Sequence, residues 1–109
     1  MSSEIREPTY LVLTALAGGR RHGYGLIRDI EGISEGKVRL RAGTLYATLD
    51  RLASDGLVEV AGEEVVDGRA RRYYQLTTSG TAALADESRR RLVVSKEALR
   101  RLRFAGGLA

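Results

Sequence analysis

Hydrophobic residues recur at helical spacing in several stretches of the chain, and the most informative stretch runs from residue 39 to residue 57. Leu45, Leu49 and Leu52 fall at positions i, i+4 and i+7 and predict one buried stripe on a helix of about three turns. Gly56 is expected to end this helix. With an advance of about 100° per residue, the opposite face carries small and polar side chains: Gly43, Thr44, Ala47, Asp50, Arg51 and Ser54.

Two further helices are predicted ahead of this one. Pro8 suits the first turn of a helix, which Gly18 and Gly19 then end. The apolar residues of this helix are expected to be core: Tyr10, Leu11, Leu13, Ala15, Leu16 and Ala17. A second helix follows the glycine-rich segment 20–25 and has these apolar residues at helical spacing: Leu26, Ile27 and Ile30. A loop over residues 32–38 would join it to the third helix.

After the third helix the periodicity changes from helical to alternating. Residues 57–60 and 71–76 are predicted to be paired strands. The connection 62–70, with Gly68 and Arg69 near its tip, is expected to be too long for a two-residue turn and to form an extended wing. Two helices joined by a short loop and followed by a hairpin predict a winged helix-turn-helix. The fold class is therefore mostly α with a small β-hairpin (α+β).

The C-terminal region 77–109 is predicted to form one long helix with a loose end at 105–109. Thr77 or Thr78 can cap it, and without a proline it could run for about 25 residues, or roughly 40 Å. A seam recurs along it at steps of three and four residues: Leu84, Ser88, Leu92, Ser95, Leu99 and Leu102. A small domain cannot cover both sides of such a helix, so the four leucines are expected to join a homodimer. The alternative is a helix folded back on its own domain.

Composition excludes several classes of function. None of the 109 residues is cysteine, which excludes disulfides, thiolate metal sites and a cysteine nucleophile. His22 is the only histidine, so we expect no enzyme activity, metal or cofactor. No apolar run approaches the roughly 20 residues that span a bilayer, and the N-terminus lacks a signal-peptide core. We therefore expect a cytoplasmic protein with a domain at residues 1–76 and an appended helix at 77–109.

The net charge of +4 lies in the C-terminal third, because basic and acidic residues balance over residues 1–76. A high isoelectric point is thus a poor argument for nucleic acid, and the local distribution matters more. There are two basic clusters. One precedes the third helix and consists of Lys37, Arg39 and Arg41. The other follows the tip of the wing and consists of Arg69, Arg71 and Arg72. Arg89, Arg90 and Arg91 surround the last helix and are expected to be solvated.

The third helix and the wing together suggest contacts with DNA. A short helix with small outer residues can enter a major groove and present its N-terminal residues to base edges. Arginines on a wing can reach phosphates or an adjacent minor groove. On this geometric interpretation the contacts come from five residues: Arg41, Ala47, Arg51, Arg69 and Arg71. The alternative is an ordinary polar helix face beside a hairpin with solvated arginines.

Gly23, Tyr24 and Gly25 mark a tight entry to the second helix. If this helix crosses a DNA backbone, its N-terminal amides and the Tyr24 hydroxyl are placed to hold a phosphate. Alternatively, Tyr24 packs half-buried on the first helix. His22 is interpreted as a turn residue rather than a switch.

Four short motifs occur in order along the chain: His22-Gly23-Tyr24-Gly25, Gly43-Thr44-Leu45-Tyr46 with Leu49 and Arg51-Leu52, Asp55-Gly56-Leu57, and Arg72-Tyr73-Tyr74-Gln75-Leu76-Thr77. This set closely resembles the PadR family of bacterial transcriptional regulators over residues 8–84, in its short, subfamily-2-like form. The resemblance implies a repressor that dimerises through its C-terminal helix. It also implies release from a double-stranded DNA operator by a small phenolic or other hydrophobic effector. By motif match it implies DNA contacts for four residues: Tyr24, Gly43, Thr44 and Tyr46.

The sequence departs from the family pattern in places. Arg41-Ala42 stands where the family usually has Ser-Pro, so a capping hydroxyl worth about 1 kcal/mol is lost, and Arg41 could supply a phosphate contact instead. Ala47 stands where a proline is often seen. The chain has no tryptophan, so the indole sandwich of multidrug-sensing relatives cannot form. An effector cavity between the C-terminal helices and the first helix is instead expected to be lined by Tyr10, Val93 or Phe104.

The expected function is therefore a ligand-responsive repressor that binds DNA as a homodimer. The rival hypothesis is a winged-helix module that binds protein. Binding to a protein would survive high salt, whereas binding to DNA falls steeply as salt rises. An enzyme is disfavoured because the adjacent carboxylates Glu63 and Glu64 lie on a predicted exposed hairpin with no second acid or base nearby.

Overall fold

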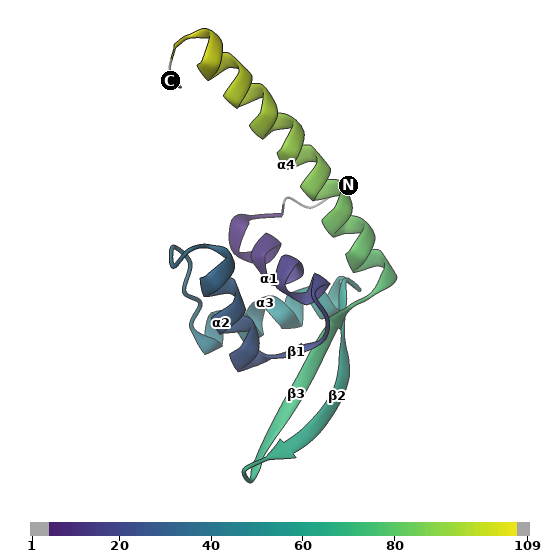
Figure 1. Ribbon diagram of the computed structural model, residues 1–109. Coiled ribbons are helices and arrows are strands. Elements are labelled where there is room, and N and C mark those ends of the chain that lie inside the picture. Colours follow the sequence, from purple (N-terminus) through teal and green to yellow (C-terminus); the bar gives the residue numbers. More distant parts are fainter. Residues whose placement is uncertain (1–4, 107–109) are drawn as a thin grey trace.

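A computed structural model of the chain describes residues 5–106, so residues 107–109 of the loose end predicted at 105–109 lie outside the described range. The elements follow in this order: α1 (Glu7–Ala17), β1 (Arg21–His22), α2 (Gly23–Ile33), α3 (Ala42–Ser54), β2 (Val58–Val66), β3 (Arg69–Leu76) and α4 (Thr78–Phe104). In Figure 1 the first three helices pack together, the two long strands extend from them as a hairpin, and α4 projects on the other side. The predicted α+β winged helix-turn-helix with a long C-terminal helix is confirmed.

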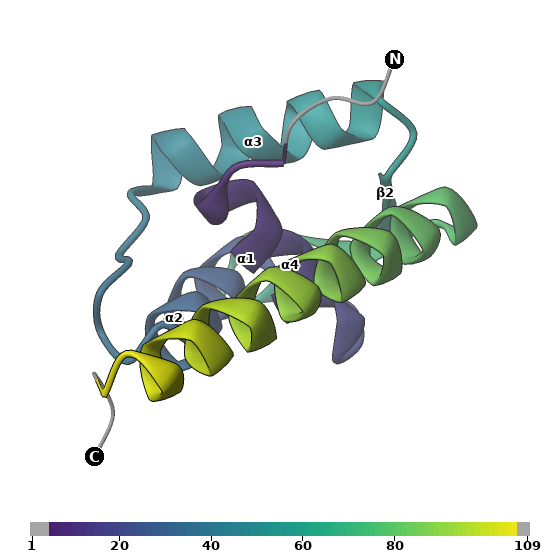
Figure 2. The same cartoon turned by 90° about the horizontal axis from the view of Figure 1, so that it is seen from above.

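The core is built around α1. Seen from above, α1 lies between α3 and α4 (Figure 2). Because it has neighbours on several sides, its buried residues are almost consecutive: Leu11, Val12, Leu13, Ala15 and Leu16. Val12 lies outside the predicted apolar face and is nevertheless fully buried, whereas Ala17, which was predicted to be core, is exposed at the end of the helix.

The predicted stripe of α3 is confirmed, because Leu45 and Leu49 have no exposed surface and Leu52 is 2% exposed. Thr48 is buried beside them, and its hydroxyl donates a hydrogen bond of 2.9 Å to the carbonyl of Thr44. The N-cap of α3 is Arg41, which makes no side-chain capping bond, as expected from the missing serine. The burial of this stripe determines which face of α3 is turned outward.

The sheet has the order β1-β3-β2 and is antiparallel throughout. Val66 pairs with Arg69, so the turn between β2 and β3 consists of Asp67 and Gly68 alone. Both residues have positive φ, 52° and 76°, as a two-residue hairpin turn of this class requires. The prediction that the connection is too long for such a turn was wrong, because both strands continue to the tip of the wing.

The two-residue strand β1 was not predicted, because two residues carry no periodicity. It pairs with β3 at Tyr73 and Tyr74. Arg20, which immediately precedes β1, donates a hydrogen bond of 3.2 Å to the carbonyl of Ala61, and its guanidinium lies 4.7 Å from the centre of the Tyr73 ring. These contacts attach the base of the wing to the start of α2.

The start of α4 is fixed by a cap and by a close backbone approach. The Thr77 hydroxyl accepts a hydrogen bond of 3.0 Å from the Gly80 amide and donates one of 2.6 Å to the carbonyl of Gly56. Gly80 is buried against Leu57, and a Cβ atom at Gly80 would lie 1.9 Å from the Leu57 carbonyl oxygen. Only glycine therefore allows α4 to lie this close to the connection between α3 and β2.

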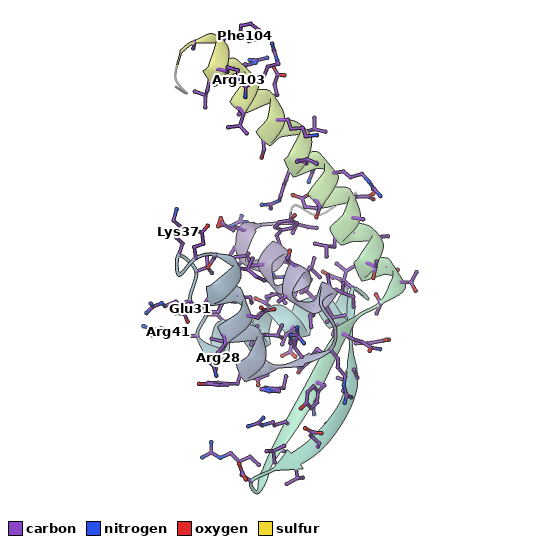
Figure 3. All side chains as sticks on the ribbon, in the orientation of Figure 1. Arg28, Glu31, Lys37, Arg41, Arg103 and Phe104 are labelled. Atoms are coloured by element: carbon purple, nitrogen blue, oxygen red, sulfur yellow. The ribbon has the colours of Figure 1, made fainter. Side chains whose placement is uncertain are left out.

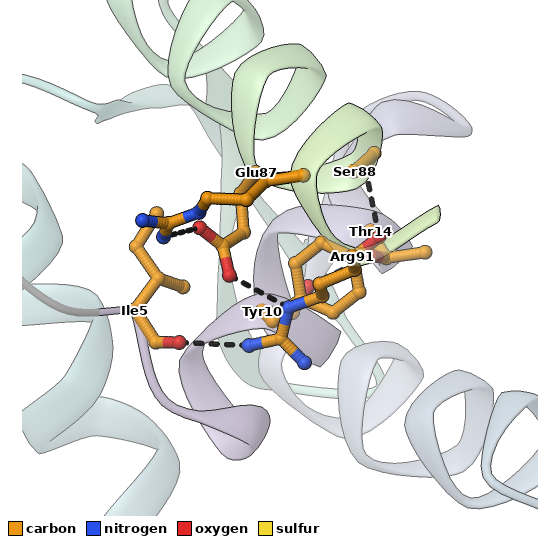
Figure 4. Close-up of polar contacts among 7 residues, drawn as sticks. Ile5, Tyr10, Thr14, Glu87, Ser88 and Arg91 are labelled. Atoms are coloured by element: carbon orange, nitrogen blue, oxygen red, sulfur yellow. Dashed lines mark hydrogen bonds and ion pairs between the residues drawn. The ribbon is translucent and has the colours of Figure 1, made fainter. Parts of the chain in front are cut away.

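Further along, α4 is bound to α1 and to the chain that precedes it (Figure 4). The hydroxyls of Tyr10 and Ser88 are 2.8 Å apart. The Arg91 guanidinium lies 4.1 Å from the centre of the Tyr10 ring and donates to the carbonyl of Ile5 at 2.7 Å. Glu87, which is 7% exposed, receives hydrogen bonds from the neighbouring arginines on its own helix. We call the contacts of Arg91 and Glu87 the α4 latch.

This packing divides the predicted seam of α4. Leu84 packs against the core of its own chain, so it is a core residue and does not belong to an exposed seam. The later leucines of the seam lie beyond α1 and are exposed: Leu92 (53%), Leu99 (54%) and Leu102 (47%). The alternative of a helix folded back on its own domain thus applies only to the first half of α4.

We predict that Gly80→Ala destabilises the protein by roughly 3 kcal/mol, because the new methyl group must displace backbone rather than a mobile side chain. Gly32→Ala in α2 is the matched control, since nothing lies within 4 Å of its Cβ position. That change should be neutral or stabilise by up to about 1 kcal/mol. Urea unfolding followed by circular dichroism measures both, and equal stability of the two variants would contradict the close approach.

We predict a pH-dependent contribution of Glu87 to stability. Hydrogen bonds from Arg90 and then Arg91 lower the pKa of Glu87 below its ordinary 4.5. The contribution is therefore complete above about pH 4.5 and is lost as the pH falls through the lower folded-state pKa. Glu87→Gln should be less stable than wild type at pH 7, and the difference should shrink in acid. Thermal unfolding between pH 3 and pH 7 measures this, and a constant difference would exclude the mechanism.

Candidate nucleic-acid interface

The outward face of α3 is the one predicted from its periodicity. Its residues are all exposed: Gly43, Thr44, Ala47, Asp50, Arg51 and Ser54. They are small near the start of the helix, so another body could approach its backbone closely there. Arg51 differs from the others in that its guanidinium donates a hydrogen bond of 2.9 Å to the hydroxyl of Thr9 in α1. It would have to leave this contact to reach a ligand in front of α3.

The start of α2 lies directly against α3 because Gly23 has no side chain. A Cβ atom at Gly23 would lie 2.2 Å from the Tyr46 hydroxyl oxygen, so a larger residue would displace the Tyr46 ring. Tyr46 itself remains 43% exposed. Tyr24 is 65% exposed, and the guanidinium of Arg28 lies 5.9 Å from its ring centre. Tyr24 is therefore not half-buried on α1, and both tyrosines face the same open side.

A hollow of about 410 Å³ lies where α2, α3 and the wing meet. It is lined by residues from all three elements: His22, Gly23, Tyr24, Tyr46, Arg69, Ala70, Arg71 and Arg72. The structure thus brings together the two tyrosines suggested by the motifs and the two wing arginines suggested by geometry. Gly43, Thr44 and Ala47 do not line this hollow, and they lie on the exposed part of the same helix.

The adjacent carboxylates Glu63 and Glu64 are both bonded to other residues of the wing. Glu63 accepts a hydrogen bond from Arg72 at 3.0 Å, and Glu64 accepts one from the Tyr73 hydroxyl at 2.6 Å. The bond to Glu63 raises the pKa of Arg72, and the bond to Glu64 raises the pKa of Tyr73. The acidic pair of the sequence is thus explained by cross-strand contacts and needs no catalytic role.

The remaining arginines of the wing are left as unneutralised cations. Within residues 5–106, neither Arg69 nor Arg71 forms an ion pair. In the cluster before α3, Arg39 pairs with Glu31 at 3.1 Å, whereas no ion pair to Arg41 is found in the described part of the chain. Figure 3 shows Lys37 and Arg41 projecting outward from the connection between α2 and α3. Positive charge therefore lies on both sides of α3, at the start of the helix and on the wing.

His22 has a larger part in this region than its interpretation as a turn residue implied. It is the N-cap of α2, and its Nδ1 atom accepts a hydrogen bond of 3.2 Å from the Gly25 amide. Its ring meets the Tyr73 ring edge-on, with the ring centres 5.4 Å apart. The position of His22 immediately before the helix was the available signal, but histidine is not among the usual capping residues.

A second hollow, of about 690 Å³, lies beside the α4 latch. It is lined by Ile5, Glu87, Arg90, Arg91, Val94 and Ser95. None of the three residues predicted to line an effector cavity borders it. The Tyr10 ring is covered by Arg91, while Val93 and Phe104 are exposed on other parts of α4. A single protomer therefore does not form the predicted cavity.

Residues 5–106 contain neither a cluster of metal-binding side chains nor a membrane-spanning helix. No group of three or more histidine, aspartate or glutamate residues in this range is placed to hold a metal ion. In the same range, no helix combines the length and the apolar character needed to cross a membrane.

Comparison with known proteins gives a consistent result. The transcriptional regulator Rv3488 of Mycobacterium tuberculosis is 41% identical over 88 residues, which cover 81% of this chain and 78% of the relative. A PadR-like transcriptional regulator of Bacillus cereus has a similar structure, with a TM-score of 0.73, 22% identity and coverage of 87% of this chain and 90% of the other.

Bacillus subtilis PadR, solved in complex with operator DNA, aligns with a TM-score of 0.66 and 22% identity over 74% of this chain and 46% of its own. At this identity the two structures show a common fold. Residues 12–86 match the transcriptional regulator PadR-like family. This match covers more than half of the sequence and includes α2, α3 and the whole wing. The chain therefore belongs to the PadR-like family of transcriptional regulators.

Proposed function

We propose that this protein is a repressor that binds double-stranded operator DNA through α3 and the wing. The proposal rests on the outward face of α3. Small exposed residues lie at the start of this helix, and its opposite face is buried in the core. A helix of this kind can enter a major groove up to its backbone. Bacillus subtilis PadR, a protein with the same fold, was solved in complex with operator DNA, which supports operator DNA as the partner.

The proposed contacts divide into two groups by chemistry. Gly43, Thr44 and Ala47 are small enough to approach base edges, and the Thr44 hydroxyl can donate to or accept from a base. Phosphate contacts are assigned to the exposed residues Tyr24, Arg41, Tyr46 and Arg69 and to the half-buried Arg71. Phosphate contacts position the protein and carry no sequence information. Arg51 is a weaker candidate, because it is already bonded to Thr9.

We further propose that two copies join through the second half of α4. Leu92, Leu99 and Leu102 lie on one side of a helix that has left its own domain, and about half of each side chain is exposed. Burying such a stripe against a second copy would remove apolar surface from water at about 25 cal/mol per Å². A two-fold dimer would also present two α3 helices to successive half-sites of the operator.

Release by a small hydrophobic or phenolic effector is the last part of the proposal. Such a compound has to bind the DNA-competent and DNA-incompetent arrangements of the dimer with different affinities. The hollow of about 690 Å³ beside the α4 latch is a candidate cavity for such a compound, because Val94 and Ser95 of α4 border it. Titration of candidate compounds into the protein–DNA complex, followed by fluorescence anisotropy, tests this part.

We predict that Arg69→Ala combined with Arg71→Ala weakens binding to all duplexes by a similar factor. The slope of log K against log salt should decrease by about 0.9 for each lost phosphate contact. Arg103→Ala is the control, because it removes one positive charge at the far end of α4 (Figure 3) and should leave the salt slope unchanged. Fluorescence anisotropy across a salt series, with the promoter region upstream of the gene and a scrambled duplex, measures these effects.

Thr44→Ala should behave differently from the wing variant. We predict that it reduces the preference for the promoter over the scrambled duplex by roughly tenfold and leaves the salt slope unchanged. Unchanged binding in both variants would remove the site assignment. Wild-type binding that is insensitive to salt would instead support the rival function, a winged-helix module that binds protein.

The dimer gives a separate prediction. Leu99→Glu combined with Leu102→Glu should convert the protein to monomers at micromolar concentration, because burying two carboxylates in an apolar seam is costly. Val93→Glu is the control, since it places one carboxylate on an exposed position roughly opposite the seam at about 100° per residue. Light scattering coupled to size-exclusion chromatography measures the mass. A monomeric wild type would contradict the proposed dimer.

A further inference from the structure

His22 stands where three elements meet, and its ring orientation is fixed by two contacts. It ends β1, caps α2 through the Gly25 amide and packs edge-on against Tyr73 of β3. Because the ring cannot turn without losing the cap, the positions of both ring nitrogens are determined. One nitrogen faces the backbone of α2, and the other faces Arg71 on the wing.

The N–H groups of His22 and Arg71 that face one another lack an acceptor between them. A neutral imidazole has one donor nitrogen and one acceptor nitrogen. Since Nδ1 accepts from the Gly25 amide at 3.2 Å, Nε2 carries the hydrogen. The atom facing Nε2, at 3.5 Å, is Nη1 of Arg71, which is also a donor. The opposite tautomer would set Nδ1–H against the Gly25 N–H at the shorter distance and would remove the cap.

Two donors that face one another in this way need a shared acceptor. They point into the hollow between α2, α3 and the wing, which Arg69 and Arg72 also line. The neighbouring carboxylate of Glu64 is bonded to the Tyr73 hydroxyl, and Arg20 lies over the Tyr73 ring. With its donors 3.5 Å apart, the pair can place both nitrogens within about 2.9 Å of one oxygen atom. A cationic donor beside a neutral one favours an anionic oxygen.

We propose that the Nε2–H of neutral His22 and the Arg71 guanidinium together bind one phosphate oxygen of the DNA backbone. This inference rests on the proposed function and adds His22 to the interface, where neither the sequence pattern nor the motif match had placed it. Because the two donors come from the end of β1 and from β3 of the wing, a single phosphate would be held where the start of α2 meets the wing. The contact positions the protein on the duplex and reads no base.

Two substitutions of His22 separate its cap from its donor. His22→Asn keeps a side-chain oxygen able to accept from the Gly25 amide, as a good N-cap residue does, but lacks the nitrogen that reaches the hollow. His22→Gln places an amide nitrogen close to the position of Nε2 and gives up the cap. Binding is measured by fluorescence anisotropy on a mixed-sequence duplex of about 30 base pairs, or three helical turns, across a salt series. Urea unfolding reports on the cap.

We expect His22→Asn to bind about tenfold more weakly than wild type with unchanged stability. Its salt slope should equal that of wild type, because a neutral donor releases no counterion. His22→Gln should be less stable and retain most of the affinity. Arg71→Gln should lower both the affinity and the slope, by about 0.9. If both residues hold one phosphate, adding His22→Asn to Arg71→Gln should cost much less than tenfold.

The outcomes separate this inference from the function on which it rests. A wild-type protein that binds no duplex contradicts the proposed function and this inference together. A wild-type protein that binds duplex DNA, with His22→Asn binding equally well, contradicts the role of His22 alone. A salt slope reduced by about 0.9 in His22→Asn would also overturn the inference, since it would require a charged His22, which cannot accept the capping bond. Additive effects of the two substitutions would show that they contact different groups.

Discussion

The burial of Leu45, Leu49 and Leu52 in α3 is the constraint on which the rest of the structure depends. Each buried leucine contributes roughly 1.5–3 kcal/mol relative to an exposed one, so turning α3 by one residue would cost more than any polar contact on its surface returns. The helix can present only its small residues outward. The positions of the wing, of α2 and of every proposed DNA contact are defined relative to this face.

Glycine backbone then determines how closely the other elements approach this helix. Gly23 lets α2 lie against the Tyr46 hydroxyl, and Gly80 lets α4 lie against the Leu57 carbonyl. A hydrophobic core alone would tolerate small shifts between helices. A close contact between the backbone and a side chain or carbonyl group tolerates them less well. The chain thus combines an ordinary leucine core with two points at which glycine permits an approach that an added Cβ atom would disturb.

Most of the fold could be predicted from periodicity, because the stripes of α1 and α3 and the alternation of β2 and β3 are strong local signals. The features that could not be predicted depend on contacts with residues far away in the sequence. Leu84 and Leu92 look equivalent in a heptad pattern, yet only Leu84 meets its own core. The hydrogen bond of Arg51 to Thr9 and the attachment of β1 to β3 could not be foreseen from either segment alone. Asp67-Gly68 is a recognisable signal for a two-residue hairpin turn, and the two strands do extend as far as this turn.

The α4 helix has a mechanical consequence beyond the surface it exposes. Its 27 residues make a rigid rod about 40 Å long, held at one end by Gly80 and steadied along its first half by Arg91 and Glu87. A pivot of about 5° at the held end would sweep the free end of a rod of that length through roughly 3.5 Å. A small rotation at the held end would therefore become a displacement of several ångströms at the free end, so the rigidity of the first half of α4 determines where the free end lies.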